Sequence, residues 1–457
     1  MNQMESMKKS ALKELCKEYL ENNQITKNEF ETYRVKRGLR NDDGTGVMAG
    51  LTHVCNVHGY IINDGDREPD TGRLIYRGID VRDIVRGCEE EKRFGFEEVV
   101  WLLVFGTLPD AEQLKLLSHL LYKNRELPSY FLEDTLMKAP SKNIMNKMAS
   151  AVISLYAYDD EPEGISLENN IRQSIALIAG LPAIMTQAYQ VKRRHFDKKS
   201  MFFHPFNPNH STAEAILTAL RPDRKFTEEE AYLLDICLIL HAEHGGGNNS
   251  TFTARVVTSA GSDIYSAIGA AIGSLNGYKH GGASLKVCTM MEDIMENVKD
   301  WEDEDEISSY LEKILRGEAG DGSGLIYGLG HAIYTLSDPR AEILKNRAKK
   351  LAEGRGLSKK LALYEKIETL TPEVFKKVTG HEKVISANVD FYSGFVYEML
   401  GIPKDLFTPM FAVARISGWC AHRIEELTTG GRIMRPAYKA LQNKGEYTLI
   451  SKRNKQK

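Results

Sequence analysis

The chain lacks the marks of several common protein classes. Its 457 residues include only six cysteines, none in a CxxC pair, so we expect neither a disulfide framework nor a cysteine zinc site. The formal net charge of −3 argues against a nucleic-acid or anionic-membrane partner. No apolar run approaches the roughly 18 residues of a membrane span. The acidic N-terminus resembles neither a secretory signal nor a transit peptide, so we expect a cytoplasmic protein with reduced thiols.

Signals of a nucleotide-binding α/β fold are also missing. The sequence shows no strand–helix alternation and no Walker-type phosphate loop. Strands are predicted only for Leu51–Ile62 and Arg73–Tyr76, which would form a short hairpin around the turn Asp64–Asp66. Elsewhere apolar residues recur at helical spacing, beginning with an amphipathic helix around Leu12 to Leu20. We therefore predict a mainly α protein with two domains.

The predicted helices then follow one another along the whole chain. They cover residues 96–105, 109–121, 143–157, 167–191, 212–220, 228–243, 252–276, 283–298, 304–316, 339–352, 372–378, 391–399 and 407–427.

Proton-handling side chains stand at the breaks between these helices. His280 is followed by Gly281 and Gly282, His331 follows Gly330, and Asp390 stands shortly before Gly394. A fourth polar cluster, residues 241–250, contains two histidines and three glycines. Taken alone, each histidine is more often a satisfied polar residue. Because glycine weakens helices, four such breaks together favour a catalytic site.

One aspartate and two histidines form the minimum set for one kind of carbon–carbon bond formation. A carboxylate can remove a proton next to a carbonyl, one imidazole can stabilise the enolate, and the other can protonate the resulting alkoxide. Asp390 lies between Val389 and Phe391, an apolar setting that would raise its pKa. A histidine beside a helix N-terminus is favoured in its neutral form, which can still donate a hydrogen bond.

Three arginines supply sites for anions. Arg340 follows Pro339, Arg415 lies on a mainly apolar helix face, and Arg435 precedes Pro436. For Arg415 alone, an acidic partner within the protein is the ordinary explanation. Together with the histidines and the aspartate, the three arginines favour a di- or tricarboxylate substrate, because guanidinium groups bind carboxylates in bidentate fashion.

Several blocks of the sequence resemble the signature blocks of citrate synthases, in the same order along the chain. They are residues 73–78, 96–109, 240–252, 277–283, 328–340, 388–394 and 415–418. The similarity runs from about residue 45 to about residue 440. The same blocks also fit 2-methylcitrate synthases, which belong to this group.

The resemblance implies a helical fold with a large and a small domain around an active-site cleft. The large domain would comprise residues 1–281 and 402–457, and the small domain residues 282–401. It also implies a homodimer in which each chain completes its partner's site. No metal and no cofactor beyond the two substrates would be needed.

The resemblance also implies a role for each site residue. Asp390 would remove the methyl proton of acetyl-CoA, His280 would stabilise the enol, and His331 would polarise and protonate the carbonyl of oxaloacetate. Oxaloacetate would be held by His244, Arg340 and Arg415 of one chain and by Arg435 of the other. The residues expected to contact CoA are Leu325, Gly328, Leu329, Gly330 and Lys383.

The chain departs from the family pattern at some positions. Ala332 and Thr335 stand where many members carry a basic residue for the CoA phosphates, so that contact would come from Lys383 or from Lys345–Lys350. Tyr278 and Lys279 replace the usual Pro-Leu before His280.

Three alternative functions stay open at this point. A 2-methylcitrate synthase would use propionyl-CoA in place of acetyl-CoA. A metal-dependent hydrolase could be built from His241, His244, His280, His331 and Asp390, but it would leave the arginines unexplained. A helical binding protein without catalytic activity is the third alternative.

Overall fold

The computed structural model describes residues 2–64, 66–382 and 384–453. The chain forms two compact units. The core unit is Gly50–Met434, and the terminal unit consists of the segments before residue 50 and after residue 434. Two residues singled out from the sequence, Gly65 of the hairpin turn and the CoA candidate Lys383, lie outside the described residues.

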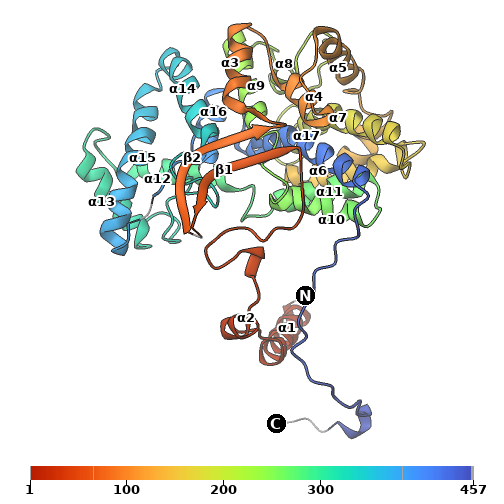
Figure 1. The fold of residues 1–457 in the computed structure, drawn as a ribbon, viewed down its shortest axis with the longest axis vertical. Helices are drawn as coiled ribbons and strands as arrows, with labels where there is room; N and C mark the ends of the chain where they lie inside the picture. The colour runs from red at the N-terminus through yellow and green to blue at the C-terminus, as the bar shows by residue number, and fades with distance from the viewer. Residues whose placement is uncertain (1, 65, 383, 454–457) are drawn as a thin grey trace. The chain divides into compact units, whose positions relative to one another are not determined.

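The core unit is mainly helical, as predicted, and its elements are labelled in Figure 1. Its longer helices are α3 (Val81–Glu90), α4 (Phe96–Phe105), α5 (Ala111–Lys123), α6 (Ile144–Ser154), α7 (Leu167–His195), α8 (Thr212–Leu220), α9 (Glu228–His241), α10 (Asn249–Ser259), α11 (Ile264–Leu275), α12 (Ala283–Asn297), α13 (Glu304–Leu315), α14 (Pro339–Gly354), α15 (Ser358–Thr379), α16 (Val389–Met399) and α17 (Phe407–Thr428). Short helical turns are a π-helical turn, η2 (Leu132–Met137), and the 3₁₀ turns η3 (Leu155–Tyr158) and η4 (Lys404–Leu406).

The predicted hairpin is present and is part of a small antiparallel sheet. Strand β1 (Cys55–Asn63) pairs with β2 (Asp66–Tyr76), and β2 pairs with the short strand β3 (Ile79–Asp80). The register shifts between His58 and Tyr60, which makes a bulge at Gly59. The sequence did not indicate β3, because two residues carry no alternating pattern.

Two helix predictions were wrong in their bounds. The predicted helix 252–276 is two helices, because Gly261 has a φ of +83° and Asp263 caps the start of α11. The predicted helix 372–378 is the end of the much longer α15, in which Pro372 lies inside the helix. Proline at that position resembles a helix start in sequence, because it is tolerated best in a first turn.

Helix α17 lies at the centre of the core unit. It packs against α4, α7, α9, α10 and α11, and Trp419 in its middle is fully buried. Helix α7 is long and apolar enough to cross a membrane by length and composition, but 78% of its most apolar window is buried inside the protein. Burial of that kind is the property of a core helix in a globular protein.

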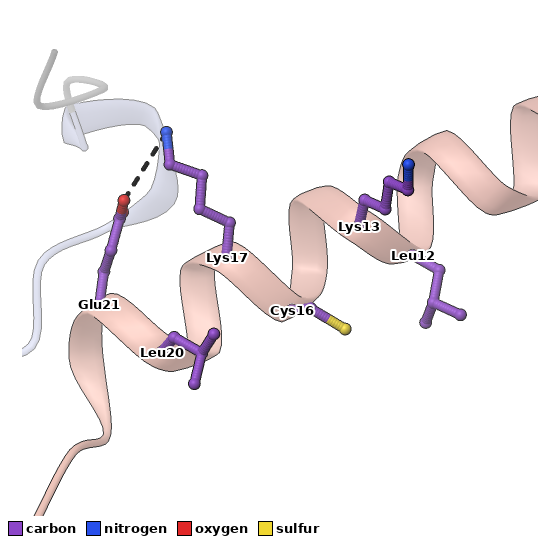
Figure 2. Close-up of a pocket in the computed structure, with 6 residues that line it drawn as sticks. All are labelled: Leu12, Lys13, Cys16, Lys17, Leu20 and Glu21. Carbon is purple, nitrogen blue, oxygen red and sulfur yellow. Dashed lines mark ion pairs between the residues drawn. The ribbon is translucent and has the colours of Figure 1, made fainter. Parts of the chain in front are cut away.

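The terminal unit is built differently. It contains α1 (Asn2–Asn22), α2 (Lys27–Thr32) and two 3₁₀ turns, Arg37–Leu39 and Ile450–Lys452. None of the described residues 11–49 and 435–453 is buried. One face of α1 forms a shallow hollow in which Lys17 pairs with Glu21, and its lining residues are Leu12, Lys13, Cys16, Lys17, Leu20 and Glu21 (Figure 2).

Candidate active site

Backbone pairing brings the His331 and Asp390 segments together. Leu329 forms an isolated antiparallel bridge with Ala387, and the N–H of Gly330 donates to the carbonyl of Ser386 (2.8 Å). Asn388 closes the other side of this pairing, since its N–H donates to the carbonyl of Gly328 (2.9 Å) and its side-chain amide to the carbonyl of Gly330 (3.0 Å). The loop before His331 is thereby fixed to the start of the helix that carries Asp390.

Glycine is required at position 328 for this arrangement. Its φ is +81°, and a Cβ atom there would lie 2.7 Å from a methyl carbon of Val287 and 3.0 Å from the Cα of Phe391. Both the backbone conformation and the close approach exclude a larger residue. The family resemblance assigned this residue to CoA contact, and the structure gives it a packing role as well.

Asp338 joins Arg340 to α16, the helix that carries Asp390. Its Oδ1 atom accepts from Nε of Arg340 (3.0 Å) and its Oδ2 atom from Nη2 (2.8 Å), while Oδ2 also accepts the N–H of Val389 (3.1 Å). Burial alone would lower the pKa of Arg340, but the ion pair with Asp338 outweighs it and raises that pKa. Arg340 is therefore a fixed positive charge in a buried place.

His331 is held in one tautomer by the backbone that follows it. Its Nδ1 atom accepts the N–H of Ile333 (3.0 Å) and the N–H of Tyr334 (3.1 Å). An atom that accepts two hydrogen bonds carries no proton, so the ring hydrogen of neutral His331 is on Nε2. Nε2 can then donate to a carbonyl oxygen.

A cluster of rings surrounds His331. The ring centroids of His331 and His244 are 5.2 Å apart, and the ring of Tyr334 lies 4.7 Å from His331 and 5.5 Å from His244. The guanidinium of Arg340 lies 5.5 Å from the centre of the Tyr334 ring. Burial and the charge of Arg340 hold the pKa of His244 well below its usual value, so His244 is neutral near pH 7.

His280 lies in the turn between α11 and α12. Its Nε2 atom is 3.1 Å from Oδ1 of Asn248, the residue that caps α10, and because an amide oxygen only accepts, the ring hydrogen of neutral His280 is on Nε2 in this arrangement. Burial and the charge of Arg415 lower the pKa of His280 to about 4. His280 is therefore neutral over the physiological range.

Arg415 is a buried cation whose hydrogen bonds are incomplete. Its Nε atom donates to the carbonyl of His241 (2.7 Å), and its guanidinium lies 4.7 Å from the centre of the Phe411 ring. Nη1 and Nη2 are buried and have no hydrogen-bond partner among the described residues. Burial lowers the pKa of Arg415, although Glu243 acts against that effect. The expected protein carboxylate is not bonded to these nitrogens, so a bound anion would satisfy them.

Asp390 has the properties of a base. It lies in the first turn of α16, next to the N-cap Asn388, whose Oδ1 atom accepts the N–H of Asp390 (3.0 Å). Burial raises the pKa of its carboxyl to about 6, although Arg340 and Arg415 act to lower it. A carboxylate of this pKa is ionised at pH 7 and is more basic than an exposed aspartate.

The structure therefore gathers most of the residues predicted from the sequence. His244, His280, His331, Arg340, Asp390 and Arg415 influence one another electrostatically within the core unit. Among the CoA candidates, Gly328, Leu329 and Gly330 form the paired loop beside His331, and Leu325 is exposed. Arg435 belongs to the terminal unit and is exposed, so its role in the site stays a prediction.

Several supporting residues were not given a role from the sequence. They are Asp338, Tyr334, Asn388, Glu243 and His422. Glu243 and His422 are fully buried, with Nε2 of His422 3.2 Å from Oε1 of Glu243. The spacing of Arg415 and His422, seven residues apart on α17, could have placed them on one helix face. Asp338 directly before Pro339 could have been read as a helix cap.

Within residues 2–64, 66–382 and 384–453, no three His, Cys, Asp or Glu side chains are arranged so that they could hold a metal ion. His241, which the hydrolase alternative would use as a ligand, instead lies against Tyr397, whose hydroxyl is 3.2 Å from Nδ1. Its ring also packs on Phe411, with the centroids 4.2 Å apart. His241 therefore serves as a packing residue beneath Arg415.

Comparison with known proteins agrees with this geometry. A family model described as the C-terminal domain of citrate synthase matches residues 43–437. Citrate synthase of Haloferax volcanii is 33% identical over 408 residues, which cover 88% of this chain and 94% of that protein. 2-Methylcitrate synthase 1 of Corynebacterium glutamicum is 32% identical over 428 residues, which cover 92% of this chain and 99% of that protein.

Solved structures show the same fold. Citrate synthase of Thermoplasma acidophilum, in a ternary complex with carboxymethyl coenzyme A and oxaloacetate, matches with a TM-score of 0.74 and 26% identity over 92% of this chain and 99% of that one. Citrate synthase of Pyrobaculum aerophilum matches with a TM-score of 0.72 and 26% identity over 89% and 94% of the two chains. The chain belongs to the citrate synthase family. It is an enzyme of the transferase class, with the helical fold of that family.

Proposed function

We propose that this enzyme joins the methyl carbon of acetyl-CoA to the ketone carbon of oxaloacetate and then hydrolyses the thioester to give citrate and CoA. The observation that carries the proposal is the cluster around Arg415. It combines a buried guanidinium with unsatisfied nitrogens, two neutral histidines and a carboxylate with a raised pKa. Such a set binds a carboxylate substrate and moves protons beside a carbonyl group.

The first step is proton removal. The Asp390 carboxylate takes a proton from the methyl group of the thioester, and the electron pair moves onto the thioester oxygen. Neutral His280 donates its one ring hydrogen to this enolate oxygen, which requires that the ring exchange its hydrogen bond to Oδ1 of Asn248 for one to the substrate. Because the pKa of Asp390 is raised to about 6, the proton transfer is less uphill than it would be to an exposed aspartate.

The second step is bond formation. The enolate carbon attacks the ketone carbon of oxaloacetate, and the new alkoxide takes the hydrogen from Nε2 of His331. The two N–H groups that donate to Nδ1 stabilise the charge left on the ring. Water then attacks the thioester carbon and returns a proton to His331. The CoA thiolate leaves and takes the proton held by Asp390, which restores the enzyme.

Oxaloacetate would be oriented by its two carboxylates. Arg415 offers Nη1 and Nη2, and His244 offers Nε2, which is buried and without a hydrogen-bond partner in the described part of the chain. Arg340 contributes its charge, although Asp338 already accepts from two of its nitrogens. We propose that the loop Gly328–Gly330 faces CoA, since it adjoins His331.

A second candidate function keeps the mechanism and changes the acyl group. Similarity to a 2-methylcitrate synthase at 32% identity, close to the 33% found for a citrate synthase, supports propionyl-CoA as an alternative substrate. One methylene changes binding in an apolar pocket by only about 1–3 kcal/mol. The ratio of the two kcat/KM values decides between the two acyl groups.

We further propose a homodimer in which Arg435 completes the partner's site. Two observations support it: Arg435 is exposed, and its unit has no buried side chain among the described residues. Free cysteines, five of them buried, support a reducing compartment such as the cytoplasm. The reaction as written needs no metal and no cofactor besides the two substrates.

The test is oxaloacetate-dependent release of CoA. The full-length protein is mixed with acetyl-CoA or propionyl-CoA, with and without oxaloacetate, and free thiol is followed with a thiol-reactive dye. We expect release only when both substrates are present, and full activity after exhaustive chelation. Release of CoA without oxaloacetate would indicate a hydrolase. Loss of activity on chelation would indicate a metal enzyme, and no release of CoA under any condition would indicate a binding protein.

A further inference from the structure

The loop that carries His331 is held by the hairpin β1–β2. Residues 316–338 between α13 and α14 contain no helix, so the loop needs support from another element. The Thr335 hydroxyl provides one contact. It hydrogen-bonds to the carbonyl of Gly59, lies 3.1 Å from the carbonyl of Asp70, and accepts the N–H of Asp70 (3.2 Å). One side chain thus binds both strands of the hairpin.

A second set of contacts surrounds this hydroxyl. Nη2 of Arg67 on β2 donates to the carbonyls of Ala332 (3.4 Å) and Ile333 (3.3 Å). The guanidinium of Arg67 also lies 4.0 Å from the centre of the Tyr60 ring, so both strands take part in holding it. These bonds hold the two peptide groups whose N–H groups belong to Ile333 and Tyr334.

Two glycines allow the close approach of the hairpin and the loop. A Cβ atom at Gly59 would lie 2.7 Å from the carbonyl oxygen of Ile333, and one at Gly72 would lie 2.0 Å from the carbonyl oxygen of Ser337. Neither glycine has a positive φ, so the close packing, and not the backbone conformation, requires glycine there. Both strands therefore touch the loop along its length.

The held segment is the one that sets the tautomer of His331. Nδ1 of His331 accepts from the N–H groups of Ile333 and Tyr334, which lie between the Arg67 contacts and the Thr335 contacts. If this turn shifted, Nδ1 would no longer accept the two hydrogen bonds, and the ring hydrogen could then move from Nε2 to Nδ1. His331 would lose the donor that the ketone oxygen requires.

We propose that Thr335 is a positioning residue for the reaction: it fastens the turn after His331 to the hairpin and so keeps the donor hydrogen of His331 on Nε2. This inference rests on the proposed function, because it assumes that His331 donates to the ketone. It also gives position 335 a role in this chain other than binding phosphate, which a threonine cannot do by charge.

The test compares four variants of the full-length enzyme. Thr335→Val keeps the shape and removes the hydroxyl, whereas Thr335→Ser keeps the hydroxyl and removes a methyl group. Thr71→Val makes the same chemical change at an exposed threonine of β2 whose side chain makes no hydrogen bond to the described residues of the loop, and it serves as the matched control. Arg67→Met loosens the same turn from its other end in case Thr335→Val does not fold.

Two quantities are measured for each variant. The first is kcat with both substrates saturating. The second is the tautomer of His331, read from the ring signals of selectively nitrogen-15-labelled histidine, with His331→Gln used for assignment. We expect Thr335→Val to lower kcat by about 10- to 100-fold, since displacement of a reacting group by about 1 Å can cost that much. The His331 signal should shift away from the Nε2–H form.

Further expectations separate positioning from a general loss of structure. Thr335→Ser should recover kcat to within a few-fold and restore the Nε2–H signal, Thr71→Val should match the wild type, and Arg67→Met should change both readouts in the direction of Thr335→Val. Unchanged kcat in Thr335→Val, or a fall in kcat with the tautomer unchanged, would overturn the proposal. If the wild-type enzyme released no CoA, the proposed function would fail instead, and the tautomer readout would still report on the hairpin contact.

Discussion

The core unit and the terminal unit differ in how their side chains are used. In the core unit, polar and charged side chains such as Arg415, Glu243 and His422 are fully buried around one cluster. In the terminal unit, none of the described residues 11–49 and 435–453 is buried, and Leu12, Leu15, Tyr19 and Leu20 are each more than half exposed. The difference teaches that the proposed chemistry can be derived from residues of the core unit, whereas a role of the terminal unit in a partner's site stays a proposal.

The largest expected effect belongs to the base. Asp390→Asn keeps the size of the side chain but cannot accept the methyl proton, so we expect kcat to fall by roughly 10²–10⁴, the usual range for loss of a general base. Oxaloacetate affinity, measured by titration calorimetry, should stay nearly unchanged. Near-normal turnover in the variant would show that Asp390 is not the base.

A smaller effect is expected from removing the unsatisfied guanidinium. In Arg415→Met, we expect the Kd for oxaloacetate to rise by about 10²-fold, because each hydrogen bond to a charged group contributes about 1.5–3 kcal/mol. The ligand-free variant should not melt earlier than the wild type, since the lost charge has no bonded carboxylate.

Arg423→Met is the matched control for Arg415→Met. Arg423 lies on the same helix and is also buried, but its Nη1 atom donates to Thr258 (3.1 Å). This variant removes a buried guanidinium from the same helix and should keep its affinity for oxaloacetate. Equal losses of affinity in both variants would mean that the effect at Arg415 is structural.

We expect the enzyme to lose activity at acidic pH because Asp390 becomes protonated. With its pKa raised to about 6, the carboxylate is protonated below that pH, and kcat should fall about tenfold per pH unit under pH 6. The effect of Asp390 on the stability of the fold has the opposite dependence on pH. The native state holds this proton to higher pH than the unfolded chain, whose aspartate has a pKa of 3.8, so the contribution of Asp390 to the free energy of unfolding decreases as pH rises between those two values.

Asp390→Asn provides the check on this pH dependence. Its residual activity should lack the acid limb near pH 6, and its free energy of unfolding should no longer decrease over the same interval. An acid limb that persists unchanged in the variant would assign the titration to another group.

The smallest expected effect is a twofold difference in activity, and it concerns Arg435 of the terminal unit. Arg435→Ala and Asp390→Asn subunits should each be almost inactive as homodimers. If Arg435 serves the partner's site, a purified heterodimer has both lesions in one site and one intact site, so it should regain about half of the wild-type activity per dimer. No recovery of activity would show that Arg435 serves its own chain, and the chemistry assigned to the core unit would stand.

Much of the fold could be predicted from the sequence, and so could the candidates for the reacting groups, whose catalytic roles stay predictions. Helices 96–105 and 212–220 have the predicted bounds, because apolar spacing and clear stop signals enclose them. His280, His331 and Asp390 were found because they stand at glycine-rich breaks. By contrast, the bonds from Thr335 to Gly59 and from Asp338 to Val389 join segments far apart in the chain. Local periodicity contains no information on such contacts, so these supporting residues could not be predicted.

The sequence also could not show whether the buried Arg415 has an acidic partner. An acidic partner is the ordinary expectation for a buried arginine, and only the packed structure shows that Nη1 and Nη2 lack one among the described residues. The division into domains at residues 282 and 401 stays a prediction. The same holds for the ordered binding that domain closure would produce, with oxaloacetate first.

The central claim is that the residues clustered around Arg415 catalyse the formation of a carbon–carbon bond. Isotope tracing tests this claim most directly. The full-length enzyme is mixed with oxaloacetate and acetyl-CoA that carries carbon-13 in both acetyl carbons, and the products are read by NMR. The account predicts citrate in which one CH₂–carboxylate arm contains both labelled carbons, formed in step with free CoA. Labelled acetate, with oxaloacetate unconsumed, would contradict it.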